Sequence, residues 1–174
     1  MTFNTTSLPL NRALRAKRLL VREPLRPLGD AKRHILVTPQ IDAILDGHVH
    51  YGLFPATETE RLVGVFAAGQ LVTVSRQFNK KRPDLEPIVG PQEVWALCAR
   101  RPKPGWRLLG RWYDKDVFVA LRAWDKTELF GKYPAAGQEI VDDWTELFGG
   151  QPAHSGQNVG DYLGGVFRDV DESS

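Results

Sequence analysis

Alternation of apolar and polar positions is clearest in the middle of the chain, where it predicts two neighbouring strands. Residues 106–112 and 117–124 each show a two-residue period, and the polar stretch 113–116 separates them. Two such runs joined by a short polar link are typical of a β-hairpin. A third apolar run, 94–99, precedes them and is followed by the basic, proline-containing loop 100–105. The sequence therefore predicts an antiparallel centre to a sheet.

Three other segments, 40–45, 57–68 and 134–148, carry apolar residues at helical spacing. Thr38 and Pro39 before the first segment are typical N-cap and first-turn residues. The second segment opens with a Thr-x-x-Glu spacing, which predicts a capping box. A proline opens the third segment and a Gly-Gly pair ends it. Helices alongside an antiparallel sheet give an α+β fold.

The two ends of the chain look different from the middle. Residues 1–34 carry eight Arg and Lys against two acidic residues, and prolines divide them, which indicates a basic arm with a short helix within 11–22. Residues 136–174 carry one Arg against eight acidic residues, and the Gly-rich part 150–174 is expected to be an acidic tail. The α+β domain is therefore assigned to 35–149, and short strands are also expected at 48–51 and 71–75. A basic beginning and an acidic end can attract each other, so the basic arm does not by itself indicate nucleic-acid binding.

Composition and hydropathy limit the classes of protein to which the chain can belong. The chain of 174 residues has a net charge of +2 and is long enough for one hydrophobic core. No run approaches the roughly eighteen apolar residues of a membrane span and no secretory leader is evident, so a cytoplasmic protein without membrane contact is expected. Cys98 lies in an apolar run and is interpreted as a core thiol. His48 and His50 share a strand face, which is interpreted as a polar surface, and neither a metal nor a cofactor is expected.

The candidate chemistry lies in cations along the predicted hairpin. Alternation places Arg107 and Arg111 on one side, and Arg122 is expected to join them with Arg100 and Lys126. Nearby aromatic residues that could stack on bases are Trp112, Tyr113 and Trp124. Grouped cations with aromatic neighbours suit a phosphate backbone or an unstacked base. The alternative is a solvated sheet edge whose charges discourage aggregation.

In order and spacing, residues 83–147 resemble the RelE-type toxin superfamily. The run 84–88 leads into the strand 94–100, which is similar to that family's Leu-Tyr-Glu-Leu-Arg strand. The segment 106–109 resembles its arginine-bearing second strand. An aliphatic third strand at 117–121 is followed, as in the family, by an aromatic-plus-lysine element, here 124–126.

This resemblance implies a small, curved, mainly antiparallel sheet with helices packed on one face. It also implies a bacterial, metal-independent endoribonuclease that cleaves mRNA on the ribosome and is neutralised by a small antitoxin. By position, Arg100, Arg107 and Lys126 would be the phosphate-binding and charge-stabilising catalytic residues. Arg111, Arg122, Tyr113 and Trp124 would then contact nucleic acid around them. A proton-transfer role falls to Tyr113 or Tyr133.

Two alternative functions come from other classes. One is a non-catalytic module on the same kind of sheet that recognises nucleic acid or protein. The other is an interaction protein in which the arm and the tail pack onto a partner or onto a second copy of the chain, as a homo-oligomer.

Overall fold

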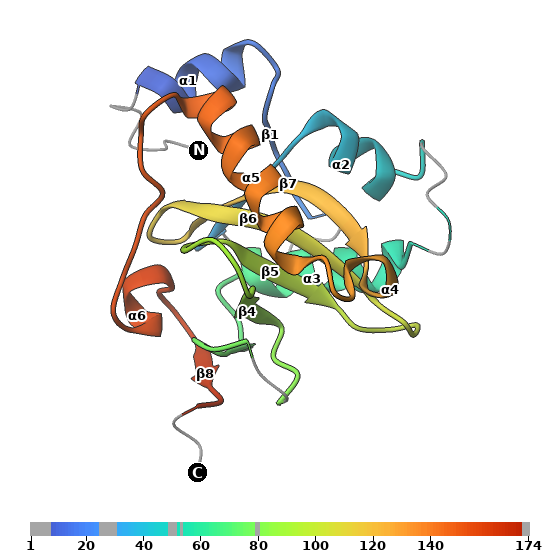
Figure 1. Ribbon diagram of the computed structural model, residues 1–174. Helices are drawn as coiled ribbons and strands as arrows, with labels where there is room; N and C mark the ends of the chain where they lie inside the picture. Colours follow the sequence, from blue (N-terminus) through green and yellow to red (C-terminus); the bar gives the residue numbers. More distant parts are fainter. Residues whose placement is uncertain (1–7, 25–30, 49–51, 53, 79–80, 172–174) are drawn as a thin grey trace.

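The computed structural model describes residues 8–24, 31–48, 52, 54–78 and 81–171. Its strands, in chain order, are β1 (Leu20–Val21), β2 (His34–Val37), β3 (Val72–Val74), β4 (Leu85–Pro87), β5 (Trp95–Ala99), β6 (Trp106–Asp114), β7 (Val117–Asp125) and β8 (Phe167–Asp169). They form one eight-stranded sheet in the order β1-β2-β7-β6-β5-β4-β3-β8 (Figure 1).

The predicted hairpin is the centre of this sheet. Strands β6 and β7 pair antiparallel, and β5 and then β4 continue the antiparallel pattern on one side. The outer pairs β2–β7, β3–β4 and β3–β8 are parallel. The sheet is therefore mixed, with an antiparallel centre.

Six helices accompany the described strands. They are α1 (Leu8–Arg15), α2 (Pro39–Leu45), α3 (Ala56–Ala67), α4 (Lys126–Leu129), α5 (Tyr133–Phe148) and α6 (Val159–Tyr162). Buried side chains of α2, α3 and α6 pack on one face of the sheet, and those of α1, α4 and α5 pack on the other (Figure 1). The α+β class is confirmed, whereas the helices cover both faces and not one.

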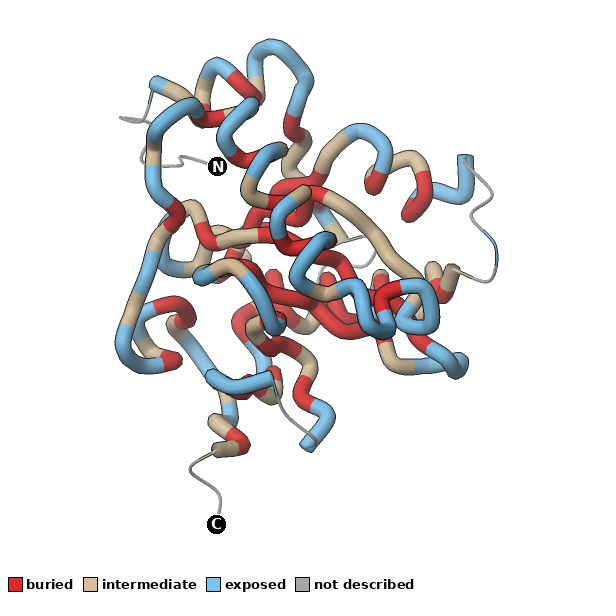
Figure 2. The backbone as a smooth tube through the Cα atoms, viewed as in Figure 1, coloured by how far each residue is buried: buried red, intermediate tan, exposed pale blue. Residues whose placement is uncertain are grey.

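Both faces are covered because both sets of alternating positions in the central strands are apolar. Leu97 and Leu108 point towards α3, while Cys98 and Leu109 point towards α5, and all four side chains are buried. Figure 2 shows the buried backbone running through the central strands with exposed segments around them. A sheet that is apolar on both sides needs a helical layer over each.

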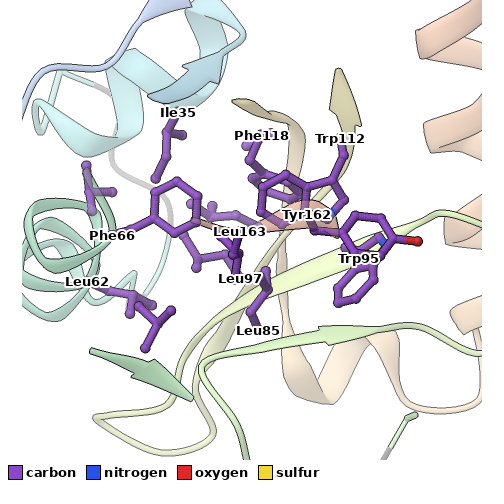
Figure 3. Packing of buried hydrophobic residues seen from close by; sticks show 14 of the residues in the cluster. Ile35, Leu62, Phe66, Leu85, Trp95, Leu97, Trp112, Phe118, Tyr162 and Leu163 are labelled. Carbon is purple, nitrogen blue, oxygen red and sulfur yellow. The ribbon is translucent and has the colours of Figure 1, made fainter. Parts of the chain in front are cut away.

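An aromatic cluster fills the face that carries α3 and α6. Trp112, which is fully buried, has its ring centroid 5.1 Å from that of Phe118 and 5.8 Å from that of Tyr162. Its centroid lies 6.1 Å from those of Phe66 and Trp95 (Figure 3). Trp112 is thus a core residue, and the expectation that it stacks on a ligand base is wrong.

The helix starts follow local chemistry in one case and tertiary contacts in the other. At α2 the backbone N–H of Ile41 donates to Thr38 Oγ1 at 3.4 Å, as the sequence predicts. At α3 the N-cap is Pro55 without a side-chain cap, so the predicted capping box is wrong. Its Glu60 carboxylate accepts a hydrogen bond from Arg22 instead.

Both ends of the described chain contribute an edge strand to the same sheet. The segment expected as a basic arm supplies β1, and its helix α1 ends at Arg15, earlier than the predicted 11–22. The segment expected as an acidic tail supplies β8, beside β3. Arg18 of the first segment forms an ion pair at 2.6 Å with Glu146 of α5, in line with the expected attraction between basic and acidic ends.

Of the two further strands that the sequence predicts, the one at 71–75 is confirmed as β3. The one at 48–51 falls mostly outside the described residues. Within the described ranges, none of the helices combines the length and the apolar character needed to span a membrane.

Candidate functional site

A β-bulge in the central hairpin decides which face Arg122 occupies. Leu109 pairs with Arg122, but the next residue, Gly110, pairs with Ala120, so Leu121 is an extra residue in β7. An inserted residue reverses the alternation beyond it, which brings Arg122 onto the α5 face with Leu109. Only glycine fits at 110, because a Cβ there would lie 1.9 Å from the carbonyl oxygen of Val119.

On that face Arg122 is neutralised by α5. Its Nε donates to Asp143 Oδ2 at 2.6 Å, and its Nη1 forms a second ion pair with Glu139. The hydrogen bond with Asp143 is the main cause that raises the pKa of Arg122. Arg122 therefore ties β7 to α5, and its charge is already balanced within the chain.

Arg111 and Tyr113 are also engaged within the protein. Arg111 donates to the backbone oxygen of Glu93 at 3.3 Å, and its guanidinium carbon lies 5.4 Å from the ring centroid of Trp144. Burial lowers the pKa of Arg111. Tyr113 packs against Phe148, with ring centroids 5.1 Å apart. These contacts place both residues beside α5.

A separate group of cations lines an open depression of about 890 Å³ at the other end of the hairpin. We call it the cationic depression, and its described lining is Arg82, Arg100, Arg101, Pro102, Lys103, Pro104, Arg107, Lys126, Thr127 and Phe130. It is built by the end of β5, the loop 100–105, the start of β6, and α4. Six of these residues are cationic and none is acidic.

Of the predicted site residues, the structure brings Arg100, Arg107 and Lys126 together in this depression. It places the other four elsewhere. Arg122 and Trp124 line a small hollow of about 160 Å³ beside α2, and Arg111 and Tyr113 lie against α5. The single surface expected from alternation is thus divided among three places.

Arg107 is the most deeply placed cation of the depression. Only 3% of its surface is exposed, and its Nη1 donates to the backbone oxygen of Trp106 at 3.0 Å. It forms no ion pair with any residue in the described ranges. Arg107 pairs across the strands with Cys98, so its charge lies above an apolar layer. A buried guanidinium without a carboxylate partner is unusual, because burying an unpaired charge is costly.

Arg100 is partly committed to the fold. Its Nε donates to the backbone oxygen of Pro83 at 2.9 Å, and its Nη2 lies 3.4 Å from Glu86 Oε1. Glu86 is buried, and its second oxygen, Oε2, has no hydrogen-bond partner. The charge of Arg100 is therefore partly balanced by a buried carboxylate, whereas that of Arg107 is not.

Two titratable side chains near these arginines, Cys98 and Tyr133, stay neutral. Cys98 is buried, and its Sγ lies 3.5 Å from Glu86 Oε1. Burial raises the pKa of the Cys98 thiol to about 12, although Arg107 and Arg100 act in the opposite direction. Burial likewise raises the pKa of Tyr133, on which Arg107 and Arg100 also act in the opposite direction. Both groups are therefore protonated at neutral pH.

The rim of the depression carries exposed cations. Arg82, Arg101, Lys103 and Lys126 are exposed, and none forms an ion pair with the described part of the chain. Lys126 opens α4, where its backbone N–H donates to Gly105 O at 3.0 Å and so joins α4 to the loop 100–105. The side chain of the N-cap residue Asp125 accepts the N–H of Thr127 at 2.6 Å.

Sequence reasoning missed several residues of this site. Within the loop 100–105 only Arg100 is a predicted site residue, whereas Arg101 and Lys103 of the loop, Arg82 and Phe130 are not among the predicted residues. The available signal was the density of cations in Arg-Arg-Pro-Lys-Pro-Gly between two strands. The loop borders the same depression as Arg107 and is joined to α4 through Gly105, a contact that the local sequence does not show.

Comparisons with known proteins add no further constraint. No protein-family model matches the chain, no curated protein is a significant match, and neither is any solved structure. Within the described residues, no three His, Cys, Asp or Glu side chains are grouped so as to hold a metal ion.

Proposed function

We propose that this protein binds the phosphate backbone of RNA in the cationic depression. The observation that carries the proposal is Arg107, a cation that is 3% exposed, lines an open depression and has no ion-pair partner among the described residues. An entering phosphate would supply the missing counter-charge, and ionised partners make hydrogen bonds stronger than neutral ones do.

The lining supports a chain of phosphates better than a single one. Four exposed cations surround Arg107 and Arg100 in one depression of about 890 Å³. Contacts with several successive phosphates give affinity without requiring a particular sequence. The described lining contains no acidic residue, and of the six cations only Arg100 has a carboxylate at ion-pair distance among the described residues, that of Glu86.

Binding is tested by fluorescence anisotropy with a short labelled RNA at several salt concentrations. We expect affinity to fall with salt, and each of Lys126→Ala and Arg101→Ala to reduce the slope of log K against log salt by about 0.7. Both side chains are exposed, so the fold should be kept.

The matched control is Lys115→Ala. Lys115 is an exposed cation at the turn of the hairpin, whereas the depression lies at the strand ends near Trp106 and Asp125. We expect it to leave affinity and slope unchanged. Equal losses from Lys115→Ala and Lys126→Ala, or binding that salt does not weaken, would contradict the proposed site.

A second candidate function is RNA cleavage of the RelE type. What favours it is that Arg100, Arg107 and Lys126, the three residues to which the resemblance gives catalytic roles, line one depression. A 2′-hydroxyl would lose its proton to a solvent water and attack the adjacent phosphorus while the 5′-oxygen leaves, and cations would stabilise the negative charge that forms. Tyr133, protonated at neutral pH, is the candidate donor to that oxygen. A small antitoxin that covers the depression would be the partner of such an enzyme.

Cleavage is tested by incubating the protein with RNA in the presence of a chelator and by measuring growth on expression in bacteria. We expect Arg107→Ala with Lys126→Ala to abolish both cleavage and growth arrest, and Tyr133→Phe to reduce cleavage while RNA binding is kept. Intact RNA together with salt-sensitive binding would remove the nuclease and leave the binding module.

A further inference from the structure

One aromatic side chain at the cationic depression has no role in the fold. Phe130 is 85% exposed, more than any other large apolar side chain in the described ranges. A single exposed apolar side chain is common on protein surfaces, so its position, and not its exposure alone, carries the argument. Phe130 belongs to the lining of the depression, together with six cations.

The local backbone structure keeps the side chain of Phe130 exposed to solvent. Leu129, just before it, is completely buried and packs under α5 with Ile140 and Trp144. The N–H of Phe130 donates to Thr127 O at 3.3 Å, which closes the turn of α4. Gly131 then has φ +75°, a conformation that glycine adopts without strain, and the chain leaves towards α5. Because Leu129 is fixed inwards, its neighbour is presented outwards.

We infer that Phe130 is a stacking platform for an unpaired base, so that the ligand of the depression is a single strand and not a duplex. This inference rests on the proposed function, because the cations bind the backbone to which that base is attached. Proteins that bind single-stranded nucleic acid combine a cationic groove, which binds the backbone, with exposed aromatic rings on which the bases stack. In a duplex the faces of the bases are covered by their neighbours, and Phe130 would have nothing to stack on.

The test compares three ligands of equal phosphate number by fluorescence anisotropy at one salt concentration. They are a single-stranded deoxy-oligoadenylate, its abasic counterpart and a duplex, all of which lack the 2′-hydroxyl needed for cleavage. We expect the single strand to bind about tenfold or more tightly than the abasic strand, the range that one or two stacked bases give. Phe130→Ala should remove that difference, and Phe130→Trp should keep it.

Leu71→Ala serves as the control, since Leu71 is an apolar side chain exposed to 52% and is not part of the depression. It should leave all three affinities unchanged. If the abasic strand or the duplex binds as tightly as the single strand, or if Phe130→Ala weakens all three equally, the stacking inference is wrong while phosphate binding stands. If none of the three binds with salt-sensitive affinity, the proposed function fails as well.

Discussion

Arg22 and Arg107 are two buried arginines with opposite surroundings. Arg22 is 7% exposed and lies against three carboxylates, with Nη1 2.9 Å from Asp42 and 2.7 Å from Asp46, and with Nη2 2.5 Å from Glu60. Arg107 is 3% exposed and has no carboxylate at ion-pair distance in the described ranges. One arginine is surrounded by acidic groups, while the other lies at an open depression among further cations.

The difference separates a structural cation from a binding cation. Burial acts to lower the pKa of Arg22, but hydrogen bonds to Asp46, Glu60 and Asp42 outweigh it and raise that pKa. Asp42 lies in α2, Asp46 is the C-cap residue of that helix and Glu60 lies in α3, so Arg22 ties the segment after β1 to two helices. At Arg107 the counter-charge is left for a ligand to provide. Acidic partners, and not depth of burial, thus distinguish the two roles.

The largest expected effect comes from removing the structural cation. Arg22→Met leaves three neighbouring carboxylates without a counter-charge, and loss of one partner from a buried ion pair costs about 3–5 kcal/mol. Urea denaturation should show this loss in the free energy of unfolding. Arg61→Met, which breaks the exposed Arg61–Glu58 pair, should cost less than about 1 kcal/mol. Similar losses in the two variants would show that the Arg22 cluster is not structural.

The next effect is a pH dependence of the free energy of unfolding, and it comes from Cys98, which lies beside Arg107 in the sheet. Folding raises the pKa of Cys98 from 9.0 to about 12. The neutral thiol therefore contributes its full stability below pH 9, and that contribution is lost as the pH rises from 9 towards 12. Cys98→Ala should flatten this alkaline loss in urea denaturation curves. An unchanged pH dependence in the variant would mean that the thiol does not lie in an apolar layer.

Arg107→Met tests directly whether Arg107 binds a ligand or, like Arg22, stabilises the fold. Since Arg107 is a buried charge without an ion pair, an apolar side chain of similar volume should leave the free energy of unfolding unchanged or raise it. The dissociation constant for RNA should rise about tenfold, which corresponds to about 1.4 kcal/mol. Anisotropy and urea denaturation on the same preparation separate the two quantities. Loss of several kcal/mol of stability with unchanged RNA affinity would make Arg107 a structural residue like Arg22.

The smallest effect is expected at Arg122. Its charge is balanced by Asp143 and Glu139, so Arg122→Gln should leave RNA affinity within twofold of the wild type, about 0.4 kcal/mol. Its effect on stability should stay near 1 kcal/mol, because the pair is only half-buried. A tenfold loss of affinity would extend the binding surface beyond the cationic depression.

Much of the fold could be predicted from local pattern. The hairpin of β6 and β7, the strand β5, the Thr38-capped helix α2 and the helix α5 all follow from period and capping chemistry close in sequence. The part played by the chain ends could not be predicted this way. Strands β1 and β8 are only two and three residues long, and their pairing with β2 and β3 joins distant segments.

The candidate site was predictable only in part for the same reason. Alternation grouped Arg107 with Arg111, yet their surroundings differ, because Arg111 lies over the ring of Trp144 whereas Arg107 lines the cationic depression together with the loop 100–105. Convergence of Arg100, Arg107 and Lys126 was expected and is found in the depression. Phe130 could not be predicted, because the local sequence does not distinguish an exposed phenylalanine from a buried one.

The sequence alone determined where the cations lie along the chain and which central strands carry them, since strand period and turn chemistry act over a few residues. Tertiary structure decided which of those cations are neutralised. Asp143 and Glu139 reach Arg122 only because α5 packs on the sheet beyond the bulge at Leu121, whereas no described carboxylate reaches Arg107. Coulomb attraction depends on distance in space, and distance in space is set by packing between segments far apart in the chain.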